Sequence, residues 1–175
     1  SFYEYALKHS VNYKFEHMEE KLNLWFDPVQ LQKVIFNLLS NAFKYTKAKG
    51  SITVSIRKIK NEVEIRVEDD GVGISKESIP KIFDRFYQVD GQSSEFTLGT
   101  GIGLAVSKGI VELHKGNIRV ESEVGQGSVF IVTLLTGNEH FPKEVLSDSE
   151  SNFHLIKDGV LEDLALEELM LEEPV

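Results

Sequence analysis

Two asparagines and a lysine lie in one stretch of helical periodicity, residues 30–46 ("QLQKVIFNLLSNAFKYT"). Asn37, Asn41 and Lys44 fall on the flank of its apolar stripe, although asparagine is a poor helix former. Amide oxygens and an ammonium group along one helix edge could hold a divalent cation and a phosphate, because Mg²⁺ prefers oxygen ligands and keeps several waters. A solvated helix face that includes two asparagines is the alternative. The residues expected to face the core are Leu31, Val34, Ile35, Leu38, Leu39, Ala42 and Tyr45.

A carboxylate ends the predicted strand 62–69 ("EVEIRVED"). Val63 and Val67 share the core-facing phase of this strand, and Asp69 continues it, so its carboxylate should face inward while Asp70 faces away. An inward carboxylate needs a partner, because unpaired burial is costly. The amino group of adenine would be one such partner.

Glycines follow this strand and also open a second predicted helix. Gly71 and Gly73 would let the chain turn and a flat ring approach the backbone, although "EDDGVG" could also be a simple turn. The run "LGTGIGLAVSKGI" opens a helix, where free N–H groups favour phosphate. It lacks the Gly-Lys-Ser/Thr of a Walker A motif, and it follows a loop rather than the strand that a dinucleotide fingerprint requires. Gly99, Gly101 and Gly103 are therefore interpreted as hinges and close-approach points of a mobile loop.

The elements that position these residues follow from periodicity. Asp27 and Pro28 predict the start of the asparagine-bearing helix as N-cap and first-turn proline. The order of helices and strands predicts an α+β fold, an α/β sandwich with helices on one face of a mixed sheet. The expected pieces are a helix end at 1–9, strands at 11–17, 22–26, 51–59, 62–69, 117–122 and 128–135, a short helical or irregular piece at 79–87, a mobile loop at 88–100 and a helix at 102–114.

Composition divides the 175-residue chain into a neutral part and an acidic tail. Residues 138–175 hold eleven of the 28 acidic but only two of the 19 basic residues, which leaves 17 of each in residues 1–137 and puts the whole net charge of -9 in the tail. A boundary is therefore expected near Gly137. The absence of cysteine excludes disulfides and thiolate metal sites. No apolar run reaches the roughly 20 residues of a membrane span, so we expect no direct membrane contact. We also expect a cytoplasmic location and no nucleic-acid partner.

Four ordered segments resemble the boxes of the catalytic and ATP-binding domain of sensor histidine kinases (HATPase_c, GHKL type). They are "NLLSNAFKYT" (N box), "DDGVGI" (first glycine box), "IFDRFYQVD" (F box) and "GTGIGLA" (second glycine box), and "GQGSVFIVTL" closes the sheet. The resemblance covers about residues 13–135. It implies a mostly antiparallel five-stranded sheet with an ATP lid. It also implies a helix end or linker at 1–10, a catalytic domain at 11–137 and an acidic tail or linker at 138–175.

The resemblance also implies a role for each matched residue. Asn41 would be the magnesium ligand, and Lys44 would contact phosphate, so these two would be catalytic. Asp69 would read adenine, and Phe83 and Phe86 would anchor the lid. The cofactors implied are ATP and Mg²⁺. The implied nucleotide-binding residues are Asn37, Asn41, Lys44, Tyr45, Asp69, Gly71, Gly73, Ile74, Phe86, Gly99, Thr100, Gly101, Gly103 and Leu104.

The implied activity is transfer of the ATP γ-phosphate to a histidine of a separate dimerisation and phosphotransfer domain, in the same or a partner chain. A response regulator receiver domain, in the same chain or a separate one, would follow in the two-component pathway, and the parent protein could be a membrane-anchored sensor. None of the five histidines lies in a phosphoacceptor context, and Gln88 stands where many relatives carry arginine. A GHKL-fold ATPase or nucleotide-gated clamp is the alternative. Asn37 argues against it, because the hydrolases place a glutamate there.

Overall fold

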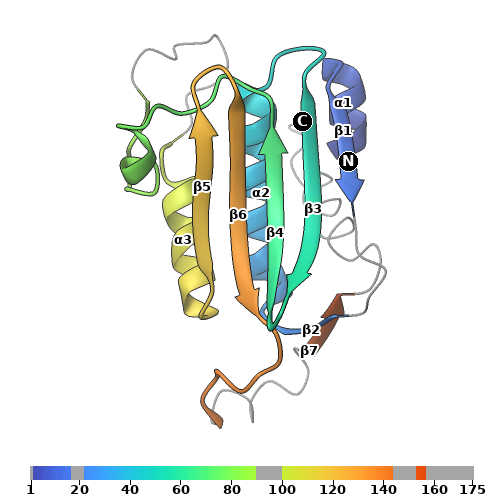
Figure 1. Cartoon of the computed structure of the whole chain (residues 1–175), viewed down its shortest axis with the longest axis vertical. Coiled ribbons are helices and arrows are strands. Elements are labelled where there is room, and N and C mark those ends of the chain that lie inside the picture. The colour runs from blue at the N-terminus through green and yellow to red at the C-terminus, as the bar shows by residue number, and fades with distance from the viewer. Residues whose placement is uncertain (1, 17–21, 90–99, 144–152, 157–175) are drawn as a thin grey trace, which may run out of the picture.

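A five-stranded mixed sheet forms one layer of the computed structural model, and helices form the other (Figure 1). The structure describes residues 2–16, 22–89, 100–143 and 153–156. The strand order is β1-β3-β4-β6-β5, in which β1 and β3 are parallel and the other pairs antiparallel. The predicted fold is therefore confirmed. The strands of this sheet are β1 (Asn12–Glu16), β3 (Ser51–Ile59), β4 (Glu62–Asp69), β5 (Asn117–Glu123) and β6 (Gly127–Leu135).

The helices all lie behind the sheet in the view of Figure 1. They are α1 (Phe2–His9), α2 (Pro28–Tyr45) and α3 (Gly103–Leu113), and a 3-10 turn, η1 (Ile79–Lys81), lies in the predicted irregular piece. The α2 helix begins as predicted: the Asp27 side chain accepts a hydrogen bond from the backbone N–H of Gln30, and Pro28 occupies the first turn. The core of the protein lies between this helix and the sheet.

The buried face of α2 differs from the predicted stripe at its C-terminal end. Six of the seven residues expected to face the core are buried, but the side chain of Tyr45 is 37% exposed, so that part of the prediction is wrong. Phe43 is buried instead, because the α1 helix covers it: the Phe2 ring stacks on the Phe43 ring at a centroid distance of 5.6 Å. A helical wheel of α2 alone contains no information about a second helix that packs on its other side.

The β3–β4 hairpin places the side chains of β4 in the predicted phase. Lys60 takes a positive φ of 57° at the turn, and the core-facing side chains alternate along β4. Val63, Ile65 and Val67 are fully buried, and Asp69 continues their phase with only 6% of its surface exposed. The Asp69 carboxylate therefore lies on the face of the sheet that α2 covers, as predicted.

The α3 helix is fastened to α2 at its C-terminal end. The backbone N–H of Asp27 donates to His114 Nε2 at 3.0 Å, and His114 Nδ1 lies 2.8 Å from the carbonyl oxygen of Ile110. Since Nε2 accepts, Nδ1 is the ring nitrogen that can donate to the Ile110 carbonyl. His114 thus joins the start of α2 to the end of α3.

Two short strands lie outside the main sheet. The predicted strand at 22–26 is found as β2 (Leu22–Trp25), but it pairs antiparallel with β7 (Phe153–Ile156) rather than joining the sheet. Part of the acidic tail therefore forms a strand, which its composition did not predict. The domain boundary near Gly137 stays a prediction. Among the described residues, no helix has the length and apolar character needed to cross a membrane.

Candidate functional site

Asp69 is a buried carboxylate at the end of β4. Its Oδ1 accepts a hydrogen bond of 2.9 Å from the backbone N–H of Gly71. Burial raises the pKa of Asp69 to about 6, while hydrogen bonds from the backbone N–H groups of Gly71 and Ser128 act in the opposite direction and the charges of Asp70 and Glu68 add to the rise. An ionised carboxylate has about four lone-pair sites, so Asp69 can accept a further hydrogen bond, such as one from an amine.

Asp70, in contrast, is exposed and supports the backbone. Its Oδ1 accepts from the N–H of Ser51 at 2.8 Å, and its own N–H donates to the Ser51 carbonyl at 3.2 Å. These bonds tie the end of β4 to the start of β3. Asp69 is therefore buried and faces inward, whereas Asp70 is exposed and bonds the backbone, as the strand phase predicted.

The first glycine box lies against the end of α2. A Cβ atom at Gly71 would be 2.5 Å from the carbonyl oxygen of Tyr45, a distance that no side chain tolerates. Gly73 has a φ of +71°, and a Cβ there would be 2.0 Å from the carbonyl oxygen of Glu123. Glycine at both positions lets the loop after Asp69 fit between α2 and the β5–β6 hairpin.

Asn37 connects α2 to the start of α3. Its Nδ2 group donates to the carbonyl oxygen of Gly103 and to Ser107 Oγ, each at 3.2 Å. Ser107 is fully buried, and a Cβ at Gly103 would be 3.4 Å from the Asn37 side chain. The N box and the second glycine box are thus in direct contact. Sequence reasoning missed Ser107, although its spacing of four from Gly103 matches the spacing of the two asparagines on α2.

Asn41 and Lys44 lie further along the same flank of α2, and both are half-buried. Within the described parts of the chain, the Asn41 side chain makes no hydrogen bond. The Lys44 ammonium lies 5.2 Å from the centre of the Tyr45 ring, a cation–π contact. The Asn41 amide and the Lys44 ammonium therefore lie on α2 between Asn37, which contacts α3, and Tyr45, whose carbonyl lies against Gly71.

The F box closes onto the second glycine box through its backbone. The N–H of Phe86 donates to the carbonyl oxygen of Gly101 at 2.9 Å, and Gly101, with a φ of +68°, has no room for a Cβ against Phe86. The Phe86 ring is 72% exposed, so the anchor at this position is the backbone and not the ring. Phe83 does pack inward, with its ring edge-on to Phe130.

The remaining predicted site residues lie nearby in sequence. Ile74 and Leu104 are partly buried against the core, and Thr100 is exposed at the start of the second glycine box. Gly99 and most of the predicted lid loop lie outside the described residues.

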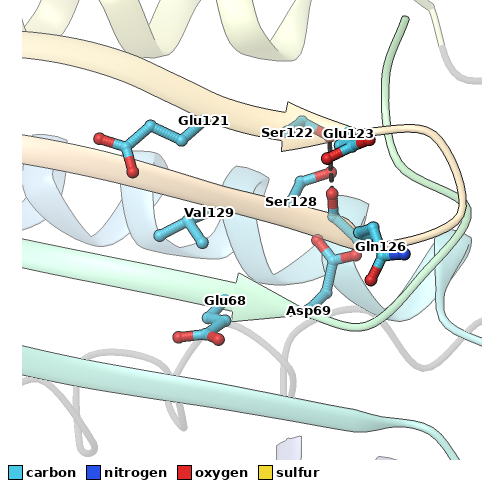
Figure 2. Close-up of a pocket in the computed structure, with 9 residues that line it drawn as sticks. Glu68, Asp69, Glu121, Ser122, Glu123, Gln126, Ser128 and Val129 are labelled. Atoms are coloured by element: carbon cyan, nitrogen blue, oxygen red, sulfur yellow. Dashed lines mark hydrogen bonds between the residues drawn. The ribbon is translucent and has the colours of Figure 1, made fainter.

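An open hollow of about 340 Å³ lies at the ends of β4, β5 and β6 (Figure 2). Three glutamates, Glu68, Glu121 and Glu123, line it together with Asp69. Because Glu68 alternates with Asp69 along β4, it faces the side of the sheet away from α2. An acidic lining of this kind repels polyphosphates, so we do not expect the triphosphate to lie in this hollow.

The donor set fits magnesium better than a metal held by protein alone. Among the described residues, no group of three or more His, Cys, Asp or Glu side chains could hold a metal ion. Mg²⁺ typically takes one or two protein ligands and completes its shell with substrate phosphates and water. The half-buried Asn41 amide would offer one such ligand.

Comparisons with known proteins identify the family of the chain. The family model described as "Histidine kinase-, DNA gyrase B-, and HSP90-like ATPase" matches residues 26–138. Histidine kinase P4 of Formosa agariphila is 37% identical over an alignment of 184 positions, which covers 99% of this chain and 13% of that protein. Sensor protein kinase WalK of Staphylococcus aureus is 39% identical over 127 residues, which cover 71% of this chain and 29% of that protein.

Solved structures give the same result. The nucleotide-free catalytic domain of histidine kinase ThkA has a TM-score of 0.66 and 29% identity, covering 77% of this chain and 86% of that one. The same kinase in complex with response regulator protein TrrA has a TM-score of 0.66 and 27% identity, covering 80% of this chain and 38% of that one.

The chain belongs to the histidine kinase-, DNA gyrase B- and HSP90-like ATPase family, whose model matches well over half of its length. Within that family it carries the catalytic ATPase domain of histidine kinases, and ATP is the ligand that membership implies. The chain spans 13% and 29% of the two curated relatives described above.

Proposed function

We propose that this chain binds ATP with magnesium and delivers the γ-phosphate to a histidine on a separate dimerisation and phosphotransfer domain. The observation that carries the proposal is the contact of Asn37 with α3. The Asn37 amide is committed to Gly103 and Ser107, and an amide is not a base. The site therefore offers no group at Asn37 to activate water, which favours transfer of the γ-phosphate over its hydrolysis.

Asp69 supports adenine as the base that is bound. A buried carboxylate accepts a hydrogen bond from the exocyclic amine of adenine, whereas guanine would present a carbonyl oxygen to it. Losing a charge-assisted hydrogen bond of this kind costs about 1.5 to 3 kcal/mol. Strong preference for ATP over GTP follows.

Asn41 and Lys44 support the phosphate end of the proposal. Asn41 would hold Mg²⁺ through its amide oxygen, and Mg²⁺ would neutralise charge on the triphosphate. Lys44 would leave the Tyr45 ring for the phosphates. Phosphoryl transfer needs mainly positioning and electrostatic stabilisation, which these groups can supply.

The partners follow from the same reasoning. A phosphoacceptor histidine domain, in the same or a partner chain, would receive the phosphoryl group. A response regulator would receive it next, as the complex of the related kinase ThkA with TrrA supports. The acidic tail would connect to a possible downstream receiver domain. We place the catalytic domain in the cytoplasm, attached to a parent protein that could be membrane-anchored.

The test is phosphotransfer to the chain's own dimerisation and phosphotransfer helices. Mixed with them and γ-labelled ATP, the wild-type chain should label the acceptor histidine. Asn41→Ala should abolish labelling by removing the metal ligand. Ser40→Ala, an exposed neighbour on the same helix, is the matched control and should label normally. Equal labelling by wild type and Asn41→Ala would overturn the assignment of Asn41.

A further inference from the structure

The hydroxyl group of Ser122 is the centre of a small hydrogen-bond network near the end of β5. It donates to the carbonyl oxygen of Gly127 at 2.7 Å and accepts from the backbone N–H of Ile74 at 2.8 Å. Ser128 lies opposite on β6, with its Oγ 3.1 Å from Ser122 Oγ (Figure 2). Because the single Ser122 proton goes to Gly127, Ser128 must be the donor in this contact. The Ser122 hydroxyl thus uses its full bonding capacity.

The bond to Ile74 reaches a loop distant in sequence. Ile74 is the last residue of the first glycine box, the loop that begins after Asp69, and it lies 48 residues from Ser122. Without the Ser122 oxygen, this backbone N–H would lose its acceptor in a half-buried place. Ser122 therefore fixes the far end of the loop whose near end carries Asp69.

The β5–β6 hairpin meets the same loop at two further points. The N–H of Gly125 donates to the carbonyl oxygen of Val72 at 2.8 Å. The backbone of Gly73 approaches Glu123 so closely that a Cβ would be 2.0 Å from its carbonyl oxygen. The loop is therefore supported along its length by the hairpin, and Ser122 supplies the side-chain contact.

We propose that Ser122 is a positioning residue for adenine recognition: its hydroxyl holds the loop from Asp69 to Ile74 so that Asp69 meets the adenine amine. The proposal rests on the proposed function, because it presumes that Asp69 reads adenine. It assigns Ser122 no contact with the nucleotide. A merely structural role would be to stabilise the hairpin turn, with no effect on the choice of base.

Base selectivity distinguishes these two roles. Inosine triphosphate has the ribose and triphosphate of ATP but carries a carbonyl where adenine carries its amine. Its N1 also carries a proton that adenine N1 lacks. The ratio of the Kd for inosine triphosphate to the Kd for ATP therefore reports on recognition of this edge of the base and is insensitive to the ribose and phosphate contacts. Both nucleotides are titrated into the same protein sample by calorimetry, so any unfolded fraction cancels in the ratio.

The variant that tests the proposal is Ser122→Ala, which removes the hydroxyl. The selectivity ratio is expected to fall by on the order of tenfold, since small misplacement of a recognition group has large effects. Ser122→Thr, which restores a hydroxyl, should recover the ratio. Thr136→Ala is the matched control: Thr136 Oγ1 donates to the Asn61 carbonyl at 2.9 Å at the opposite end of β6. This control should lower stability and leave the ratio unchanged.

The outcomes separate the inference from the proposed function. A wild-type chain without preference for ATP would contradict the role of Asp69 and hence the proposed function. A wild-type preference that Ser122→Ala retains in full would overturn the inference alone. If Ser122→Ala gives no folded protein, Ser122→Cys, with a weakly bonding thiol, replaces it, and the same ratio decides.

Discussion

The carboxyl group of Asp69 should make nucleotide binding depend on pH. Its pKa is about 6, and we propose that only the ionised form accepts from adenine. From that pKa, the ionised fraction is roughly ten in eleven near pH 7 and roughly one in eleven near pH 5. The Kd for ADP should therefore rise about tenfold between about pH 7 and about pH 5.

The same raised pKa makes the folded state less stable as the pH rises, whereas nucleotide binding becomes tighter. In the unfolded chain the carboxyl has its ordinary pKa of 3.8, so between 3.8 and about 6 the folded state binds more protons than the unfolded state. The contribution of Asp69 to stability is therefore most favourable below pH 3.8 and falls as the pH rises toward 6. Above that range the ionised, buried carboxylate costs as much as about 3 kcal/mol.

Asp69→Asn should then change binding and stability in opposite directions. At neutral pH the variant should unfold at higher urea concentration, because the buried charge is gone, and should bind ADP about tenfold to a hundredfold more weakly. Asp70→Asn is the matched control, since it keeps the oxygen that accepts from Ser51. It should change neither property greatly.

Calorimetric titration with ADP at about pH 5, 6 and 7, together with urea unfolding, measures both effects. The phosphates of ADP titrate identically in the two proteins, so that effect cancels when wild type and Asp69→Asn are compared. A wild-type pH dependence no steeper than that of Asp69→Asn would refute the reasoning. So would an Asp69→Asn variant that is less stable than wild type at neutral pH.

Three further predictions concern the rest of the site. Gly73→Ala should destabilise the chain by about 2 kcal/mol or more in urea unfolding, because φ at this position is positive and a Cβ would meet the Glu123 backbone. Gly109→Ala is the control: this glycine has open space around it, so alanine should stabilise α3 by up to about 1 kcal/mol. Asn41→Ala should abolish the Mg²⁺ dependence of ATP affinity in calorimetry, and retention of that dependence would place the metal elsewhere. Ser107→Ala, which leaves Asn37 with one acceptor, should weaken ATP binding about threefold to tenfold; unchanged affinity would count against a role of this contact.

The sequence predicted those parts of the fold that depend on local pattern. Strand alternation placed Asp69 inward and Asp70 outward, and Asp27 with Pro28 predicted the start of α2. Both follow from rules that act within a few residues along the chain.

Contacts between distant segments could not be predicted in the same way. The burial of Phe43 depends on α1, and the pairing of β2 with β7 joins segments more than a hundred residues apart. The network around Ser122 likewise arises from the close approach of the β5–β6 hairpin to the loop after Asp69. Such contacts are set by tertiary packing, which local periodicity does not contain.

The central claim is that this chain is a kinase domain and not a nucleotide hydrolase. Incubating the isolated chain with γ-labelled ATP and Mg²⁺, and following both free phosphate and label on the protein, tests it most directly. We predict that ATP is bound, that almost no free phosphate is released and that the chain does not label itself. Sustained release of free phosphate over many turnovers would contradict the claim and favour an ATPase of the same fold.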